Sequence, residues 1–287
     1  MSGARPDTGQ VDSGPPDTGP PGTGRVALVT GAGRGIGAAT VRALCRRGYR
    51  IVAVDSGAGD TATDLPGVDY PLASREQLAA VRAEHPDQIH TVLADVRDRA
   101  ALDAAAATAV ERFGRLDAAV AAAAVMVGGQ PLWETPAAHV QTLWDVDVLG
   151  VWNTAAACVP HMLAGPDPGG CRFTAVASAA GTRGLFHLAG YSMAKHAVIG
   201  LVRGLAADLV GTGVTAVAVS PGSTRTSMLA ATAALYDLDD VESFASGQLT
   251  GRLIDPGEIA ETIAFCCSVA GGVLTGSVVS AEGGFRG

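Results

Sequence analysis

Short apolar runs alternate with longer stretches of helical spacing along the chain from Arg25 onward. The runs are nearly continuous in valine, alanine and leucine, a pattern typical of strands covered on both faces. Alternating strands and helices predict an α/β fold with a doubly wound parallel sheet and right-handed crossovers. The predicted strands are residues 26–30, 51–55, 90–95, 116–122, 172–178, 214–220 and 278–280, and the predicted helices are residues 35–47, 99–113, 136–163, 189–210 and 256–268.

Two connecting segments, residues 56–88 and 223–255, are longer than ordinary connections, and loops of that length usually carry function. In such sheets ligands bind at the carboxyl ends of the strands, near the point where the strand order reverses. The second segment mixes apolar helical spacing with Gly247 and polar breaks, as expected of a lid. We therefore expect one domain over residues 25–287, with a substrate lid around residues 223–255.

Residues 1–24 differ in composition from the rest of the chain. Proline alternates there with glycine, aspartate and threonine, including two copies of PDTG. Such a segment cannot bury enough apolar surface to offset its chain entropy, so we predict a disordered tail. A short partner-binding motif is the alternative.

Composition narrows the classes of partner and compartment. The chain is 48% hydrophobic but only 5% aromatic, so alanine, valine and leucine must build the core. A net charge of −8 without a basic block argues against a nucleic acid or a membrane surface as partner. We find no membrane-spanning apolar run and no secretory signal, and we expect a cytoplasmic protein. The five cysteines form no CxxC pair and no cluster with histidine, so we expect buried, reduced thiols and no metal site: Cys45, Cys158, Cys171, Cys266 and Cys267.

A glycine-rich string, TGAGRGIG at Thr30–Gly37, follows the first predicted strand and opens the first predicted helix. Glycine is needed where the chain turns with positive φ and where backbone must touch a pyrophosphate. The free N–H groups and the helix dipole at residues 35–37 would then face the anion. This strand–turn–helix context predicts a dinucleotide-binding loop, with a simple tight turn as the alternative.

Asp55 ends the second predicted strand, 18 residues after Gly37. A carboxylate at that place accepts hydrogen bonds from the adenosine ribose and repels a 2′-phosphate. Residues 56–59 contain no arginine or lysine to receive that phosphate, so we predict NAD rather than NADP. A turn-capping role is the alternative for Asp55. Asp95 ends the third strand in the same way and is a weaker candidate for the adenine edge.

Tyr191 and Lys195 are four residues apart and therefore share a face of a helix. Ser178 ends the preceding strand 13 residues before Tyr191, at the edge where the cofactor should lie. We expect the cationic Lys195 to lower the pKa of Tyr191 toward the working pH. Tyr191 can then exchange a proton with an alcohol or ketone while hydride moves to or from the nicotinamide, and Ser178 stabilises the reacting oxygen.

These motifs occur in an order that resembles the classical branch of the short-chain dehydrogenase/reductase family, from Arg25 to Phe285. The resemblance rests on TGAGRGIG, Ser178, YSMAK at Tyr191–Lys195 and PG at Pro221–Gly222. It implies a Rossmann fold with a seven-stranded parallel sheet and helices on both faces. It also implies a homotetramer or dimer that forms through the helices at 136–163 and 189–210. The cofactor-binding residues that follow are Gly31, Gly33, Arg34, Gly35, Ile36, Gly37, Asp55, Asp95, Val96, Ala122, Tyr191, Lys195, Pro221, Gly222, Thr224 and Thr226.

Two departures from the family pattern stand out. The usual NNAG motif is replaced by four alanines at residues 121–124, and the usual fourth catalytic residue, an asparagine, is replaced by Asp147. In the family the backbone carbonyl at that place links the lysine to solvent through a water, and Asp147 can present the same carbonyl. Its carboxylate either stabilises Lys195 or is a tolerated helix substitution.

A finer resemblance is to the mycofactocin-associated dehydrogenases. It is carried by YPLASREQL at residues 70–78, GGQPLWET at 128–135 and SPGSTRTSML at 220–229. It implies NAD that does not exchange, with electrons passing to a peptide-derived carrier. We expect segment 56–88 to fold over the adenosine end of the cofactor and to slow its release.

The expected substrate pocket is apolar, which favours a small aliphatic, cyclic or terpene-like alcohol or ketone over a sugar or an acid. Two other classes compete with the oxidoreductase. A non-catalytic NAD(H)-binding sensor has no need of the serine, tyrosine and lysine, and a sugar-nucleotide epimerase usually carries a different glycine spacing and a larger substrate domain. The predicted substrate residues are Met126, Trp133, Leu185, Phe186, His187 and Met228, with Leu229, Leu235, Tyr236 and Phe244 from the lid.

Overall fold

The computed structural model describes residues 24–60 and 64–286, so the predicted tail lies outside the described residues apart from Gly24. Seven parallel strands form one sheet in the order β3-β2-β1-β4-β5-β6-β7, which confirms the predicted fold class. The order reverses between β1 and β4, and both of these strands end at the same edge. The strands are β1 (Val26–Thr30), β2 (Arg50–Asp55), β3 (Ile89–Leu93), β4 (Ala118–Ala121), β5 (Arg172–Val176), β6 (Thr215–Pro221) and β7 (Val278–Ala281).

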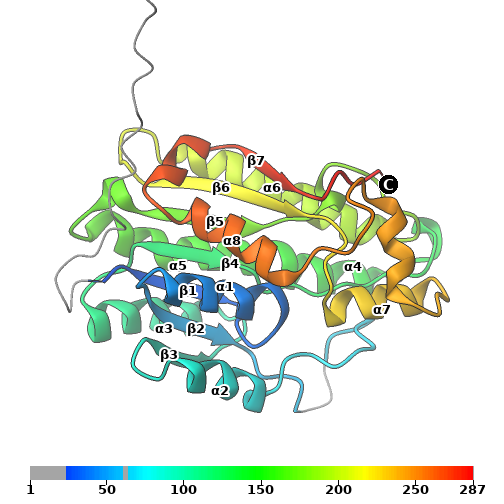
Figure 1. Cartoon of the computed structure of the whole chain (residues 1–287), viewed down its shortest axis with the longest axis horizontal. Coiled ribbons are helices and arrows are strands. Elements are labelled where there is room, and N and C mark those ends of the chain that lie inside the picture. Colours follow the sequence, from blue (N-terminus) through cyan, green and yellow to red (C-terminus); the bar gives the residue numbers. More distant parts are fainter. Residues whose placement is uncertain (1–23, 61–63, 287) are drawn as a thin grey trace, which may run out of the picture.

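Helices cover both faces of the sheet (Figure 1). On one face α1 packs against α8 and lies near α2, and on the other α3 packs against α5 beside α6. Two shorter helices, α4 and α7, flank the carboxyl edge of the sheet. The bounds are α1 Gly35–Arg46, α2 Arg75–Glu84, α3 Arg99–Phe113, α4 Ala137–Leu143, α5 Gly150–Ala164, α6 Ala189–Asp208, α7 Ser227–Leu235 and α8 Pro256–Cys266.

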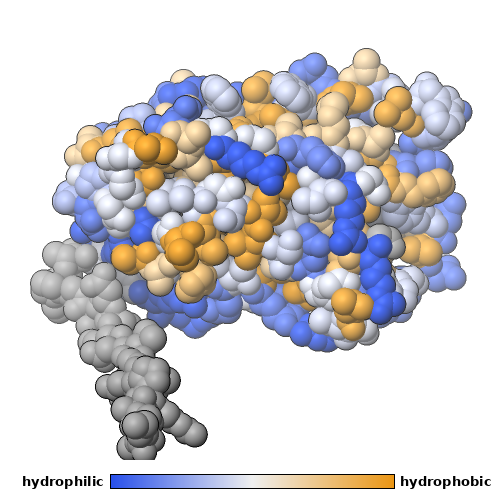
Figure 2. All heavy atoms as spheres, turned by 90° about the horizontal axis from the view of Figure 1, so that it is seen from above, coloured by the Kyte–Doolittle hydropathy of each residue, from blue (hydrophilic) through white to orange (hydrophobic). Residues whose placement is uncertain are grey.

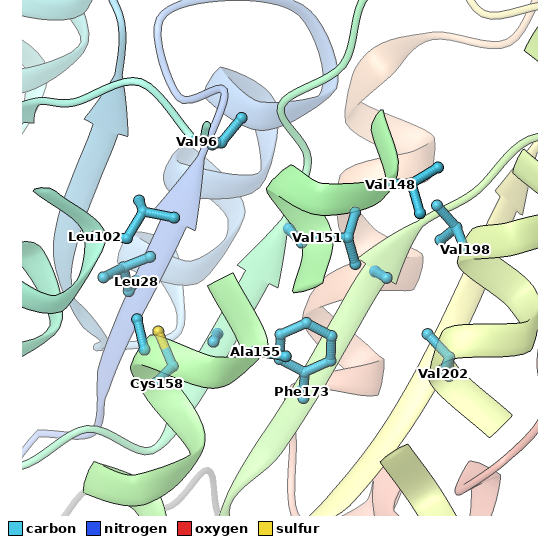
Figure 3. Packing of buried hydrophobic residues seen from close by; sticks show 14 of the residues in the cluster. Leu28, Val96, Leu102, Val148, Val151, Ala155, Cys158, Phe173, Val198 and Val202 are labelled. Carbon is cyan, nitrogen blue, oxygen red and sulfur yellow. The ribbon is translucent and has the colours of Figure 1, made fainter. Parts of the chain in front are cut away.

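The sheet divides the core into two layers because successive side chains of a strand point to opposite faces. On β1, Leu28 belongs to the layer under α3, α5 and α6, whereas Val29 belongs to the layer under α1 and α8. Figure 3 shows the first layer, where Leu28 and the ring of Phe173 lie beneath Val151 of α5 and Val198 of α6. Small side chains let the helices lie close to the sheet, which holds the strand ends in fixed positions.

The helix predicted over residues 136–163 is divided in the structure. A π-helical turn at Trp144–Leu149 separates α4 from α5. Such turns insert one extra residue into a helix and often occur at functional sites. The inserted turn carries Asp147, whose side chain is completely buried.

The connection between β2 and β3 contains a helix that the sequence analysis missed. Helix α2 begins after Ser74, whose hydroxyl accepts a hydrogen bond from the Gln77 amide while the Gln77 side chain accepts one from the Ser74 amide. This capping box was the available signal. Residues 64–74, which precede α2 and are called the strap below, run along the carboxyl edge of the sheet.

All five cysteines are buried free thiols, as expected. Burial raises the pKa of Cys45 and of Cys158 to about 12, so these thiols are poor nucleophiles. None of the helices within residues 24–60 and 64–286 combines the length and apolar character needed to cross a membrane.

Candidate active site

A cleft of about 630 Å³ runs along the carboxyl edge of the sheet. It extends from the glycine-rich loop after β1, past the ends of β4 and β5, to the segment around α7. The cleft therefore lies where the strand order reverses, as expected for a ligand site of this fold.

The glycine-rich loop forms one end of the cleft. Gly31 and Gly35 have φ values of +66° and +56°, which favour glycine. Helix α1 begins after Arg34 without a side-chain cap, whereas α2, α3 and α8 are each capped by a side chain. The N–H groups of its first turn are left available for an anion in the cleft, and this fits the pyrophosphate of a dinucleotide.

Asp55 lies beside this loop at the end of β2 and is 8% exposed. One carboxylate oxygen accepts a hydrogen bond from the Gly33 amide at 2.9 Å, and the other accepts one from the Gly57 amide at 3.2 Å. Burial raises the pKa of Asp55, while these two amides and the Arg34 guanidinium oppose the rise. The carboxylate lines the cleft at the position expected for the adenosine ribose.

Two further charged residues at this end already have partners in the protein. Arg34 donates a hydrogen bond to the carbonyl of Pro71 and lies 5.8 Å from the ring centroid of Tyr70, so its guanidinium is bound to the strap. Asp95 accepts hydrogen bonds from the Arg97 guanidinium, the shortest at 2.7 Å, and from the Arg97 amide at 2.9 Å. Both residues line the cleft, as do Val96, Ala122, Pro221, Gly222, Thr224 and Thr226.

The predicted reacting groups come together in the middle of the cleft. Ser178 follows β5, and its hydroxyl is fixed by the Ala180 amide at 3.1 Å. Tyr191 and Lys195 lie on one face of α6, are 8% and 2% exposed, and line the same cleft. The Ser178 side chain acts to lower the pKa of Tyr191, and the Lys195 ammonium lies 5.5 Å from the centroid of the tyrosine ring.

The direction of the Tyr191 pKa differs from the sequence-based expectation. Burial raises the pKa of the phenol above its ordinary value, and the negative charge of Asp147 adds to the rise. Lys195 lowers the pKa as expected, and Ser178 acts in the same direction, but together they do not outweigh the burial. The expectation was wrong because it considered only the lysine and not the cost of charging a buried phenol.

Asp147 is a direct neighbour of Lys195. One carboxylate oxygen lies 3.1 Å from the lysine Nζ, and the other accepts a hydrogen bond from the Val125 amide at 2.8 Å. Burial works to lower the pKa of Lys195, but Asp147 and Tyr191 outweigh it and raise the pKa above the ordinary value. Lys195 also donates a hydrogen bond to the Val176 carbonyl at 3.4 Å, so its ammonium is held from two sides.

Four of the predicted substrate residues line the far end of the cleft, namely Met126, Leu185, Phe186 and Met228. The lid residues Leu229, Tyr236 and Phe244 line it as well.

Three predicted substrate residues do not line the cleft, and one of them, Leu235, packs against the hydrophobic core instead. Trp133 is 81% exposed in a short turn at Leu132–Glu134, where its indole N–H hydrogen-bonds to Glu134. His187 stacks on Phe186 and turns the chain with a φ of +54°, and it is not among the cleft residues.

Sequence reasoning also missed two residues near the cleft. The hydroxyl oxygen of Tyr70 accepts a hydrogen bond from the Met126 amide at 2.9 Å, so the strap is bound to the segment after β4. Phe285, which follows β7, lines the substrate end of the cleft. Both are far in sequence from the residues they meet, and no local pattern indicates these contacts.

The chain matches known proteins over most of its length. The family model described as enoyl-(acyl carrier protein) reductase matches residues 31–286. A short-chain reductase protein named NovJ from Streptomyces niveus is 35% identical, over 90% of this chain and 93% of that protein. Cis-4-hydroxycyclohexanecarboxylate dehydrogenase from Sinomonas cyclohexanicum is 34% identical, over 91% of this chain and 96% of that protein.

A solved structure agrees with these matches. Carveol dehydrogenase from Mycobacterium avium, in complex with NAD, superposes with a TM-score of 0.84 at 30% identity, covering 91% of this chain and 97% of that one. The fold, the cleft and the long matches lead to one conclusion. The chain belongs to the classical short-chain dehydrogenase/reductase family and is an NAD-dependent oxidoreductase.

Proposed function

We propose that the enzyme interconverts a secondary alcohol and a ketone on a small, apolar, cyclic or terpene-like substrate, with Tyr191 as the general acid and base. The observation that carries this proposal is the meeting of Ser178, Tyr191 and Lys195 in one cleft with the glycine-rich loop. An NAD(H) sensor would not need these three groups beside the nucleotide.

Each of the three side chains has a distinct task. In the oxidation direction Tyr191 accepts the hydroxyl proton of the alcohol, and in the reduction direction it donates a proton to the ketone oxygen. Ser178 donates a hydrogen bond to the reacting oxygen and stabilises its developing negative charge. The Lys195 ammonium favours the phenolate form of Tyr191 against the effect of burial.

The cofactor is expected at the other end of the cleft. Gly35, Ile36 and Gly37 would hold the pyrophosphate, Asp55 the adenosine ribose and Thr226 the nicotinamide carboxamide. Thr226 is suitably fixed, because its hydroxyl accepts a hydrogen bond from the Leu229 amide at the start of α7. When bound, NAD supplies the hydride chemistry of the reaction.

The substrate end of the cleft supports an uncharged substrate. Its walls are the apolar side chains named above, together with the hydroxyl-bearing residues Ser227, Thr232, Ser243 and Ser246. Among the described residues, the charged groups that line the cleft lie in the glycine-rich loop, at the adenosine end, or at Lys195. An apolar pocket with few polar groups favours a ring or a branched hydrocarbon with one oxygen function. The names of the matched relatives, carveol and hydroxycyclohexanecarboxylate dehydrogenases, agree with a cyclic alcohol.

We further propose that NAD is held without free exchange and that a mycofactocin-type carrier removes its electrons. The strap supports slow release, since Leu65 and Leu72 line the cleft and four bonds tie the strap down. The ties are Thr142 to the Pro66 carbonyl at 3.0 Å, the Met126 amide to Tyr70 at 2.9 Å, Arg34 to the Pro71 carbonyl, and Arg97 to Asp64 at 3.5 Å.

We propose that the enzyme is a homodimer or homotetramer that assembles through α4, α5 and α6. Trp152 is 60% exposed on α5, and Trp144 and Met193 line a shallow apolar groove between α4 and α6. Figure 2, which views the molecule from above the orientation of Figure 1, shows apolar side chains gathered among polar ones on that face. Light scattering compares the particle size of wild type with that of Trp152→Glu. A smaller particle for the variant supports this assembly, and a particle of unchanged size contradicts it.

The test of the proposed function begins with the purified protein. It is dialysed extensively and denatured, and any released nucleotide is identified by mass. Intact protein is then mixed with cyclic secondary alcohols, and nicotinamide reduction is followed by absorbance. If bound NAD is reduced but not released, the result supports both the alcohol–ketone reaction and the non-exchanging cofactor. Turnover on freely added NAD supports only the reaction. Nucleotide binding without reaction of any alcohol or ketone would favour the sensor.

A further inference from the structure

The segment that follows β7 reaches the substrate end of the cleft. Residues 283–286 pair with residues 247–250, at the base of the lid. The Leu249 amide donates a hydrogen bond to the Gly284 carbonyl at 3.1 Å, and the Arg286 amide donates one to the Gly247 carbonyl at 2.8 Å. Gln248 and Phe285 are antiparallel partners in this pairing, and Gly247 and Phe285 both line the cleft.

An arginine from the catalytic side of the cleft fixes the same phenylalanine. Arg183 lies five residues after Ser178, in the loop that leads to Leu185 and Phe186. Its guanidinium donates a hydrogen bond to the Phe285 carbonyl and lies 5.6 Å from the centroid of the Phe285 ring. Both contacts are to one residue, so Arg183 joins the loop after the catalytic serine to the segment after β7.

Together these contacts connect three segments that are far apart in sequence. A charge-assisted hydrogen bond is stronger than a neutral one, and an arginine over an aromatic face adds a second attraction. The main-chain pairing fixes the backbone of Phe285 from one side, and Arg183 fixes its carbonyl and ring from the other. Phe285 is therefore held from two sides at the place where it lines the cleft.

We propose that Phe285 determines the size of substrate that the enzyme accepts, and that Arg183 is the positioning residue that holds the ring in place. The proposal rests on the proposed function, because it concerns the same apolar substrate end. Pocket walls of this kind discriminate by size, and one extra or missing methylene in an apolar pocket changes relative rates by about 10- to 200-fold.

The first test compares cyclohexanol with 4-tert-butylcyclohexanol for wild type and Phe285→Ala. We expect the ratio of kcat/KM for the bulky alcohol to that for the small one to rise by about tenfold or more in the variant. The matched control is Phe265→Ala, which removes a half-exposed phenylalanine of α8 that is not among the cleft residues. A ratio for Phe285→Ala within about twofold of wild type, equal to that of the control, would overturn the proposal.

The second test concerns the positioning role of Arg183. Arg183→Ala should raise the same ratio, and the double variant should show no larger rise than Phe285→Ala alone, since the arginine then has no ring to hold. If the two substitutions change the ratio independently, so that their effects multiply in the double variant, the positioning role of Arg183 is contradicted. Phe285→Leu, which keeps an apolar side chain at that place, should give a smaller rise in the same direction.

Binding measurements separate this proposal from the proposed function. The affinities of cyclohexanone and 4-tert-butylcyclohexanone are measured by calorimetry for wild type and Phe285→Ala, with NAD present. A relative affinity that shifts toward the bulky ketone supports the pocket wall even if no alcohol is oxidised, in which case only the proposed reaction fails. If wild type oxidises the alcohols but neither the kcat/KM ratio nor the affinity ratio shifts in Phe285→Ala, the proposed role of Phe285 is wrong. The proposed reaction is then still supported.

Discussion

The Asp147 carboxylate lies 3.1 Å from the Lys195 ammonium, and both side chains are buried. The ion pair depends on the π-helical turn between α4 and α5, which carries Asp147, and on the Val125 amide, which fixes the other carboxylate oxygen. Where the family usually has an asparagine, this chain has a carboxyl group beside Lys195. Burial raises the pKa of Asp147, and Lys195 opposes the rise, so the charge of this pair can be probed by replacing the carboxyl group.

We predict that Asp147→Asn shifts the pH dependence of the reaction to lower pH. Asp147 raises the pKa of Tyr191, so removing its charge should lower that pKa. As the pH rises and Tyr191 loses its proton, the rate of alcohol oxidation rises and the rate of ketone reduction falls. In Asp147→Asn both of these transitions should occur at lower pH than in wild type. Turnover at the optimum should stay within about tenfold of wild type, which is about 1.4 kcal/mol of barrier.

The measurement for Asp147 is a pH profile of kcat/KM in both directions. Asp145→Asn is the matched control, since Asp145 lies on the same turn but hydrogen-bonds to Gln141. An unshifted profile for Asp147→Asn would show that the carboxylate does not act on the tyrosine. A loss of turnover far beyond tenfold would show that the charge is required for the reaction itself.

Asp55 should determine the choice between NAD and NADP. Replacing it with asparagine removes the negative charge that repels a 2′-phosphate. We expect the ratio of the NADP to the NAD affinity to rise at least about tenfold, or about 1.4 kcal/mol. Asp103→Asn, on the exposed face of α3, is a control for the loss of a carboxylate. Equal changes in the affinities of both nucleotides would argue against this role of Asp55.

Release of NAD should become faster in Tyr70→Phe. The variant leaves the Met126 amide without its acceptor and loosens one tie of the strap, and an unsatisfied buried donor costs about 1–3 kcal/mol. We expect the rate of NAD release, measured by exchange with labelled NAD, to rise about tenfold. Tyr49→Phe is the control, because this buried tyrosine hydrogen-bonds to the Cys267 carbonyl on the face of the sheet covered by α1 and α8. If both variants release NAD at the wild-type rate, the strap does not limit release.

The local parts of the site could be predicted from the sequence, because they depend on short-range geometry. The four-residue spacing of Tyr191 and Lys195 places both on one face of α6, and a glycine-rich string after a buried strand forms the loop before α1. Asp55 was predicted at its strand end for the same reason, since β2 ends there.

The long-range parts could not be predicted in this way. The contact of Asp147 with Lys195 requires a π-helical turn, which hydrophobic spacing does not reveal. The position of Phe285 against Arg183 joins segments about 100 residues apart, and the raised pKa of Tyr191 depends on burial in the folded protein. Trp133 was misplaced because local sequence does not show which way the short turn at Leu132–Glu134 directs its side chain, and in the structure that side chain lies in solvent.

The most direct test of the proposed reaction is the comparison of Tyr191→Phe with wild type and with Tyr49→Phe. Hydride transfer from a cyclic secondary alcohol to NAD is followed by absorbance in a single turnover, and NAD binding is measured separately. We predict that Tyr191→Phe binds NAD normally but loses about 10²- to 10⁴-fold in rate, while Tyr49→Phe keeps the wild-type rate. A Tyr191→Phe variant that transfers hydride at the wild-type rate would contradict the assignment of Tyr191 as the general acid and base.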